Sequence, residues 1–172
     1  TLSFNNQTNI NGRLFSFNDS GNSSEIFEIK AGSSYIEKTF QTGLRNIDWE
    51  AITNDGENFY VGEFGNNLGT RKDLKIYQIP FRNDSLIVDS IKTIPFFYPE
   101  QTDFTPKNIN NNFDAEAMIF SDGNIHLFTK EWITNTVSHY VIDKNLTENQ
   151  PAKKLESFDT GFVVTDASVF EN

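Results

Sequence analysis

Short runs of alternating apolar and polar residues, interrupted by turn signals, fill most of the chain. The same arrangement occurs twice, in residues 48–62 and in residues 114–128: one short run, an Asp-Gly dipeptide and a second short run. The dipeptides are Asp55-Gly56 and Asp122-Gly123. An Asp-Gly pair between β-rich runs is a strong signal for a hairpin. The pattern therefore predicts two antiparallel hairpins.

Further strands are expected around these two hairpins. An earlier hairpin is predicted within residues 2–17, where Asn11-Gly12 supplies the turn. Third strands are predicted at residues 25–29, 74–79 and 138–142, and fourth strands at residues 35–40, 90–97 and 153–158. No run shows the apolar spacing of three and four residues that an amphipathic helix requires over several turns. The chain is therefore expected to be all-β.

A repeat underlies these strands. Asp48 and Asp114 are 66 residues apart, and Asp114 and Asp166 are 52 residues apart. Four short strands at such a period are typical of a propeller blade. We expect an all-β chain that is a β-propeller fragment of about three four-stranded blades, in one domain. The approximate blade boundaries are residues 1–44, 45–110 and 111–161, with the start of a next blade at 162–172.

An ordinary β-sandwich with a chance repeat is the alternative fold, because sandwiches also consist of short strands separated by turns. Propellers close with about four to eight blades. Three blades would leave sheet faces and edges uncovered. We therefore expect the natural protein to continue past residue 172, or another chain to cover these edges.

Charge and composition narrow the range of partners. The chain has 14 Lys and Arg against 24 Asp and Glu, a net charge of −10. Such a field repels a phosphate backbone, so nucleic acid is not an expected partner, whereas a cation or a small polar molecule is. The chain has no Cys, which excludes disulfides and thiolate metal sites. No apolar run has the length of a membrane-spanning helix, so no membrane span is expected.

The common catalytic motifs are absent from the sequence. There is no G-x-S-x-G elbow, no P-loop and no G-x-G-x-x-G loop. His126 and His139 are the two histidines, and their spacing excludes an H-E-x-x-H zinc motif. We interpret both as ordinary strand residues.

Acidic residues recur at corresponding places of the repeat. Two Asp-x-Glu pairs begin the first strands of the second and third units, and two further acidic residues follow second strands. On a strand, residues two apart share one face. The first strand of each blade lines the central channel, so these groups are expected to meet at one mouth. The candidate metal ligands are Asp48, Glu50, Asp114, Glu116, Asp19 and Glu63.

Clustered carboxylates repel one another unless a cation neutralises them or their pKa values are raised. Oxygen ligands of this kind suit a hard cation, and Ca²⁺ is the expected one. The alternative is structural: an Asp at a strand start often accepts hydrogen bonds from backbone N–H groups of a neighbouring loop. Lys130 is interpreted as a counter-charge to the acidic set. Trp49 is interpreted as packing between blades or as the floor of a ligand pocket.

Five segments of the chain carry a family resemblance: residues 17–22, 48–52, 60–67, 71–77 and 112–117. In these segments the chain resembles secreted bacterial β-propeller proteins of the kind common in Bacteroidetes. That set is distantly similar to esterase-like phytase and gluconolactonase-type propellers. It implies an exported protein, whether secreted, periplasmic or at the cell surface, with a polar face at its central channel. Calcium is common among the gluconolactonase and phytase relatives. The acidic pattern is broken at two places, since Asp166 is followed by Ala167-Ser168 and the first unit has Ser3.

Two functions are compatible with these features of the sequence. The features do not decide whether the protein is an enzyme. The first is a binding or scaffold propeller in which a ligand or a divalent cation occupies the channel mouth. The second is a metal-dependent hydrolase of phosphoesters or lactones, in which a bound metal activates water and a carboxylate acts as base. Asp48, Glu50, Asp114 and Glu116 would carry that chemistry.

Overall fold

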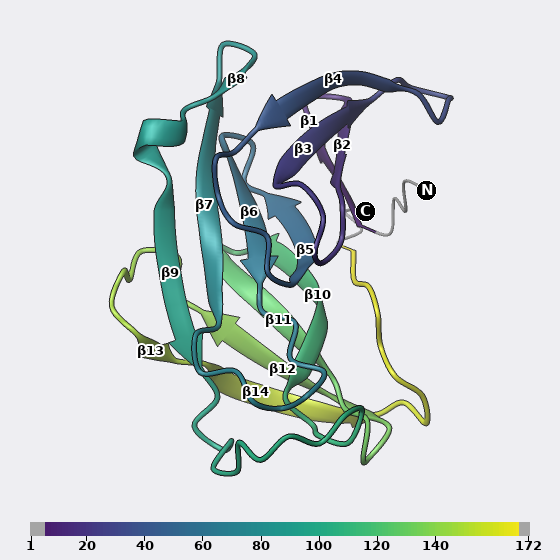
Figure 1. Ribbon diagram of the computed structural model, residues 1–172, viewed down its shortest axis with the longest axis vertical. Helices are drawn as coiled ribbons and strands as arrows, with labels where there is room; N and C mark the ends of the chain where they lie inside the picture. Colours follow the sequence, from purple (N-terminus) through teal and green to yellow (C-terminus); the bar gives the residue numbers. More distant parts are fainter. Residues whose placement is uncertain (1–5, 169–172) are drawn as a thin grey trace.

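The protein, seen in a computed structural model that describes residues 6–168, is all-β and contains three sheets and one short 3₁₀ helix (Figure 1). The first sheet is a four-stranded antiparallel meander in the order β1-β2-β3-β4. Its strands are β1 (Gln7–Ile10), β2 (Arg13–Phe17), β3 (Glu25–Ile29) and β4 (Ile36–Gln41). The turn between β1 and β2 is Asn11-Gly12, and both residues have a positive φ, of 52° and 80°. Such a turn matches the twist of a two-residue hairpin.

The middle sheet repeats this meander and adds two short strands. Its path is β13-β9-β7-β6-β5, and β8 pairs with β7. The elements are β5 (Trp49–Asn54), β6 (Asn58–Glu63), β7 (Lys75–Arg82), β8 (Ser85–Leu86), the helix η1 (Val88–Ser90), β9 (Lys92–Phe97) and β13 (Gln150–Pro151). Strand β13 pairs with β9 in parallel, although it comes from the connection between the third and fourth strands of the next sheet.

The third sheet has the order β10-β11-β12-β14 and is antiparallel throughout. Its strands are β10 (Asp114–Ser121), β11 (Asn124–Lys130), β12 (Thr136–Ile142) and β14 (Lys153–Asp159). The turn between β10 and β11 is Asp122-Gly123, and again both residues have a positive φ.

The all-β class is confirmed, as are the three predicted hairpins and the strands expected after them. The short strands β8 and β13 were not predicted. Residues 163–168 form no regular structure, and residues 169–172 of the expected next unit lie outside the described part of the chain. Ser3 also lies outside it.

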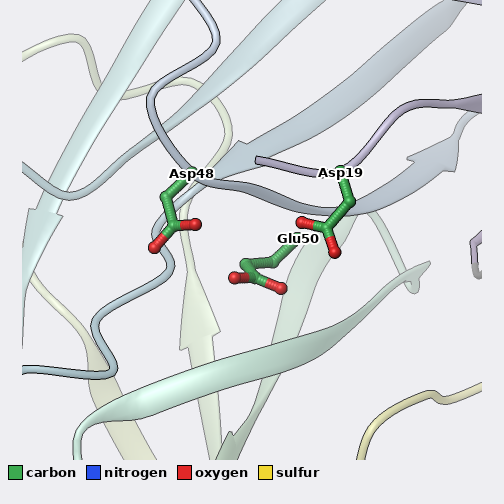
Figure 2. A group of neighbouring side chains, drawn as sticks. All are labelled: Asp19, Asp48 and Glu50. Carbon is green, nitrogen blue, oxygen red and sulfur yellow. The ribbon is translucent and has the colours of Figure 1, made fainter. Parts of the chain in front are cut away.

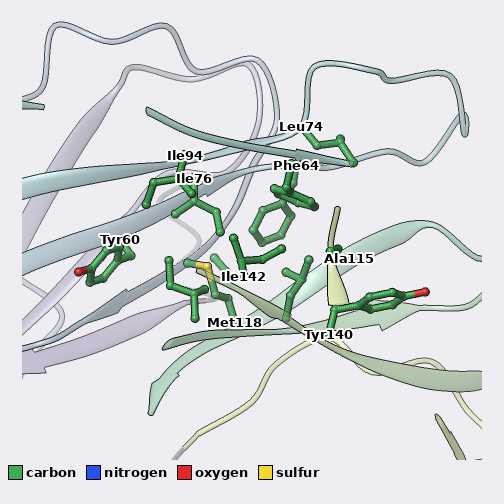
Figure 3. Close-up of a cluster of buried hydrophobic side chains, with 14 of the residues drawn as sticks. Tyr60, Phe64, Leu74, Ile76, Ile94, Ala115, Met118, Tyr140 and Ile142 are labelled. Carbon is green, nitrogen blue, oxygen red and sulfur yellow. The ribbon is translucent and has the colours of Figure 1, made fainter. Parts of the chain in front are cut away.

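Two apolar clusters hold the three sheets face to face. The cluster between the first and middle sheets is rich in phenylalanine and includes Phe15, Phe40, Phe59 and Phe81. The cluster between the middle and third sheets includes Tyr60, Phe64, Ile76, Met118 and Ile142 (Figure 3). Both arise because alternate residues of each strand point to the same face.

The first strands of the three sheets lie next to one another, with β5 in contact with both β1 and β10. Polar side chains reinforce these contacts. The Asn54 amide donates to the Thr8 hydroxyl at 2.6 Å and to the Asn9 carbonyl at 2.8 Å. On the other side, the Phe120 N–H donates to the Thr53 hydroxyl at 3.1 Å. Residues of the first and third sheets therefore both contact β5.

Candidate functional site

A cavity of about 470 Å³ lies where the three sheets meet. Four of its eight lining residues are acidic. They come from the loop after β2, from β5, from β10 and from the segment after β14. The lining residues are Asn6, Phe17, Asp19, Trp49, Glu50, Glu116, Thr165 and Asp166.

Three carboxylates converge here, and two of them, Asp19 and Glu50, line the cavity. Asp19, Asp48 and Glu50 each offer one oxygen atom, and these atoms lie within 4.8 Å of one another. Figure 2 shows the Glu50 carboxylate between those of Asp48 and Asp19. Asp48 and Asp19 belong to loops, whereas Glu50 belongs to β5. The group therefore combines ligand atoms from the loop after β2, the loop before β5 and β5 itself.

Local backbone structure brings Asp48 and Glu50 together. The pairing of β5 with β6 is shifted between Trp49 and Ala51, which marks a bulge at Glu50. Gly65 lies directly against this bulge, and its N–H donates to the Asp48 carbonyl at 3.2 Å. A Cβ atom at Gly65 would overlap the carboxylates of both Asp48 and Glu50. The absence of a side chain at Gly65 thus leaves room for the acidic pair.

None of the three carboxylates forms an ion pair within residues 6–168. No ion pair therefore offsets the repulsion between their negative charges. Burial raises the pKa of Glu50 to about 10, and the charges of Asp48, Asp19 and Glu116 add to this. Burial also raises the pKa of Asp48, against the opposing effects of Ser20 and Arg71. Without a cation, Glu50 therefore keeps its proton at neutral pH.

This protonation makes stability depend on pH. The folded protein holds the Glu50 proton up to a pKa of about 10, while the unfolded chain releases it near the ordinary value of 4.5. The contribution of Glu50 to stability is complete below pH 4.5 and is lost as the pH rises toward 10. In EDTA we expect the free energy of unfolding to fall across this window, and to fall less steeply in Glu50→Gln. Urea melts at several pH values would measure this, and equal slopes in the two proteins would contradict it.

Three of the other predicted ligands have partners of their own. Glu63 is fully buried, accepts hydrogen bonds from the N–H groups of Ile47 at 2.9 Å and Asp48 at 3.0 Å, and pairs with Arg71 at 2.9 Å. Glu116 lies on the cavity wall and pairs with Lys130, which is the counter-charge expected from the sequence.

Asp114 is also fully buried. It accepts hydrogen bonds from the Asn66 N–H at 2.8 Å and from Trp132 Nε1 at 2.9 Å. Of the six candidates, Asp19, Asp48 and Glu50 are thus brought together and Glu116 lies beside them. Glu63 and Asp114 hold loops, which is the structural alternative considered for such residues.

Four further residues of the cavity were not predicted as site residues: Asn6, Phe17, Thr165 and Asp166. Asp166 was noted only as the start of a new unit without an Asp-x-Glu pair, yet it lines the cavity together with Thr165. The signal in the sequence that could have identified Asp166 was its place after the strand predicted at residues 153–158, where a new unit was expected to begin. Asn6 also lines the cavity, and its amide donates to the Glu50 carbonyl. Trp49 combines the two roles expected of it: its side chain is fully buried against Phe17 of the first sheet and also lines the cavity.

No protein-family model and no curated protein matches the chain. Among solved structures, it is similar to a crystal structure from Bacteroides uniformis that is described as a "putative 6-phosphogluconolactonase". The two are 10% identical with a TM-score of 0.43, and the match covers 90% of this chain but 43% of the other. A likeness at this level says nothing about the function of this chain. No helix in residues 6–168 is long and apolar enough to cross a membrane.

Proposed function

We propose that this chain is part of a β-propeller whose acidic cavity binds a divalent cation, with Ca²⁺ as the ion that suits it best. The observation that carries the proposal is the convergence of Asp19, Asp48 and Glu50, which have oxygen atoms within 4.8 Å of one another. Bringing three carboxylates together costs free energy that a bound cation would offset.

The order of the strands supports the propeller. In each sheet, the strand that comes first in the sequence lies at one edge of an antiparallel meander. These three edge strands are β1, β5 and β10, and β5 is in contact with both of the others. This is how blades succeed one another around a central channel. We place the blades at residues 1–44, 45–110 and 111–161, with a further blade starting in 162–172. The acidic cavity then belongs to one mouth of the channel.

The ligand atoms favour calcium over other metals. Ca²⁺ takes six to eight oxygen ligands and tolerates irregular geometry, whereas Mg²⁺ demands a near-ideal octahedron. Three carboxylates, the nearby amide of Asn6 and water would supply such a set. Sites of this type in extracellular modules bind Ca²⁺ with dissociation constants of about 10⁻⁴ to 10⁻³ M. We place the protein outside the cytoplasm, as the resemblance of its sequence to exported β-propeller proteins implies.

Calcium is expected to stabilise the folded chain. At one hundred times the dissociation constant, binding adds about 2.7 kcal/mol. For a chain of this length that corresponds to a rise in Tm of about 5–10 °C. In EDTA at neutral pH, Glu50→Gln should have about the same Tm as the wild type, because Glu50 is already uncharged there, and it should lose most of the response to calcium. Thermal melts with CaCl₂ and EDTA would measure both effects.

The matched control is Glu37→Gln, which makes the same change at an exposed position of β4. It should respond to calcium like the wild type. Isothermal titration calorimetry would add the stoichiometry, expected to be one ion, and would show proton release on binding, because Glu50 must ionise. A Tm that calcium leaves unchanged, or a response that survives in Glu50→Gln, would rule out this site.

Hydrolysis of phosphoesters or lactones is a second candidate, favoured by Glu116 on the wall of the same cavity. Burial raises the pKa of Glu116, while Lys130 opposes this shift. A carboxylate so placed can exchange a proton with water on a bound cation. Calcium-dependent turnover of a phosphoester and lactone panel that is lost in Glu116→Gln would support this activity. Calcium binding without turnover would support the binding function and contradict the hydrolase.

A further inference from the structure

The two histidines of the chain face each other on the third sheet. His126 lies on β11 and His139 on β12, and His126 Nδ1 is 2.8 Å from His139 Nε2. The neighbours Ile125 and Leu127 point into the core shared with the middle sheet. Because side chains alternate along a strand, His126 points to the opposite face of the third sheet. The pair is therefore separate from the acidic cavity.

The outer nitrogen of each ring also has a partner. His126 Nε2 is 3.2 Å from the Ser121 carbonyl, which can only accept a hydrogen bond. His126 Nε2 therefore carries a proton, and Nδ1 of the neutral ring presents its lone pair to His139. His139 Nδ1 is 3.4 Å from the Glu156 carboxylate, which is also an acceptor. A proton on His139 Nδ1 leaves Nε2 of the neutral ring as a second lone pair.

We propose that His126 Nδ1 and His139 Nε2 bind one divalent transition-metal ion, of the Zn²⁺ or Cu²⁺ class. Metal-ligating histidines almost always donate their other ring N–H to a backbone carbonyl or a carboxylate, which fixes the tautomer and the ring. Ser121 and Glu156 are in these positions. Without metal, one inner nitrogen donates to the other, and a shift of that proton to His139 Nδ1, beside Glu156, frees both lone pairs with no net loss of a proton.

The ring positions fit such an ion. With metal–nitrogen bonds of about 2.0 Å and a tetrahedral angle, two imidazoles on one Zn²⁺ have centroids roughly 5 Å apart. The centroids of His126 and His139 are 5.1 Å apart. A tilt of each ring about its own position brings both lone pairs onto one ion. The outer contacts, at 3.2 and 3.4 Å, are long enough to accommodate this tilt.

The surroundings hold the pair while leaving access to it. His139 stacks on Phe128 with the ring centroids 4.7 Å apart and an interplanar angle of 16°. The side chain of His139 is 14% exposed and that of Glu156 is 53% exposed, so the rings border solvent. Two imidazoles leave positions for water or for another ligand, as catalytic metal sites do. Imidazole favours Zn²⁺ and Cu²⁺, whereas Ca²⁺ prefers oxygen, so the two sites of the chain select different ions.

The experiment is a Zn²⁺ titration of the whole chain by calorimetry, with excess Ca²⁺ present to occupy oxygen sites. One ion should bind per chain. His139→Gln should lower the affinity by more than the roughly 10- to 100-fold loss that outer-shell changes cause, and Glu156→Gln should lower it by about tenfold. The control Glu37→Gln should leave it unchanged. Stoichiometric Zn²⁺ binding that survives His139→Gln, or no binding, would overturn the proposal.

A second measurement needs no substitution. In nitrogen-15 spectra of the wild-type imidazoles, Zn²⁺ should shift His126 Nδ1 and His139 Nε2 together, because these are the coordinating atoms. With Cu²⁺, electron paramagnetic resonance should show two coupled nitrogens. Imidazole signals that ignore Zn²⁺ would mean that the pair is only a hydrogen bond, and would end the proposal. Neither result depends on the calcium site.

Discussion

Replacing Glu63 with alanine should lower the free energy of unfolding by about 3–5 kcal/mol, the usual cost of removing one partner of a buried ion pair. The Glu63 carboxylate is fully buried and pairs with Arg71 at 2.9 Å. It also accepts hydrogen bonds from the N–H groups of Ile47 and Asp48. The alanine variant leaves the Arg71 charge and two backbone donors without this acceptor. Because Asp48 then loses its anchor, calcium affinity should fall as well.

Urea-induced unfolding of Glu63→Ala at neutral pH would measure this loss. The matched control is Glu57→Ala, which removes an exposed carboxylate paired with Arg82 at 3.2 Å. Exposed ion pairs contribute little, so this change should stay within about 0.5 kcal/mol. Equal losses in the two variants would show that Glu63 does not hold the loop before β5.

Phe15→Ala is the other large expected effect, again about 3–5 kcal/mol. The Phe15 side chain is fully buried between the first and middle sheets. Its ring centroid is 4.9 Å from that of Phe59 and 5.4 Å from that of Phe81. Alanine would leave a cavity that these rigid rings cannot fill, and it would remove the aromatic contacts.

Denaturant melts of Phe15→Ala should show the lower stability, with the far-ultraviolet spectrum unchanged in water if the variant stays folded. Tyr35→Ala provides the comparison, because Tyr35 is 74% exposed and its loss should cost less than about 0.5 kcal/mol. A Phe15 variant as stable as the Tyr35 variant would mean that the first sheet is not anchored by this cluster.

The strands were predictable because their signals are local. Asn11-Gly12 and Asp122-Gly123 adopt the left-handed conformations that a tight hairpin requires, and these residues tolerate them best. Alternation of apolar residues then fixed the buried face of each strand. Strand β13 could not be predicted, because its two residues pair with Phe96 and Phe97, more than fifty residues earlier in the chain. Nothing in the local pattern specifies such a contact.

The acidic site was predictable only in part, because equivalent positions of a repeat meet different partners. Asp48 and Asp114 both begin an Asp-x-Glu pair. Asp114 is enclosed by the Asn66 N–H and Trp132, whereas Asp48 lies beside Glu50 and Asp19. Apart from Glu50, these partners come from loops elsewhere in the sequence. For the same reason, His126 and His139 could be recognised as strand residues but not as neighbours.

Strand β13 also determines which sheets unfold together. Through it, the backbone of the connection between β12 and β14 hydrogen-bonds to β9, and the Ala152 N–H donates to the Phe97 carbonyl at 2.8 Å. Main-chain hydrogen bonds therefore connect the middle and third sheets. We expect these two sheets to unfold together. The first sheet is held by side chains such as Asn54 and Phe15. In native-state hydrogen exchange, its amides should report a separate opening of lower free energy, while the other two sheets should exchange as one cooperative unit.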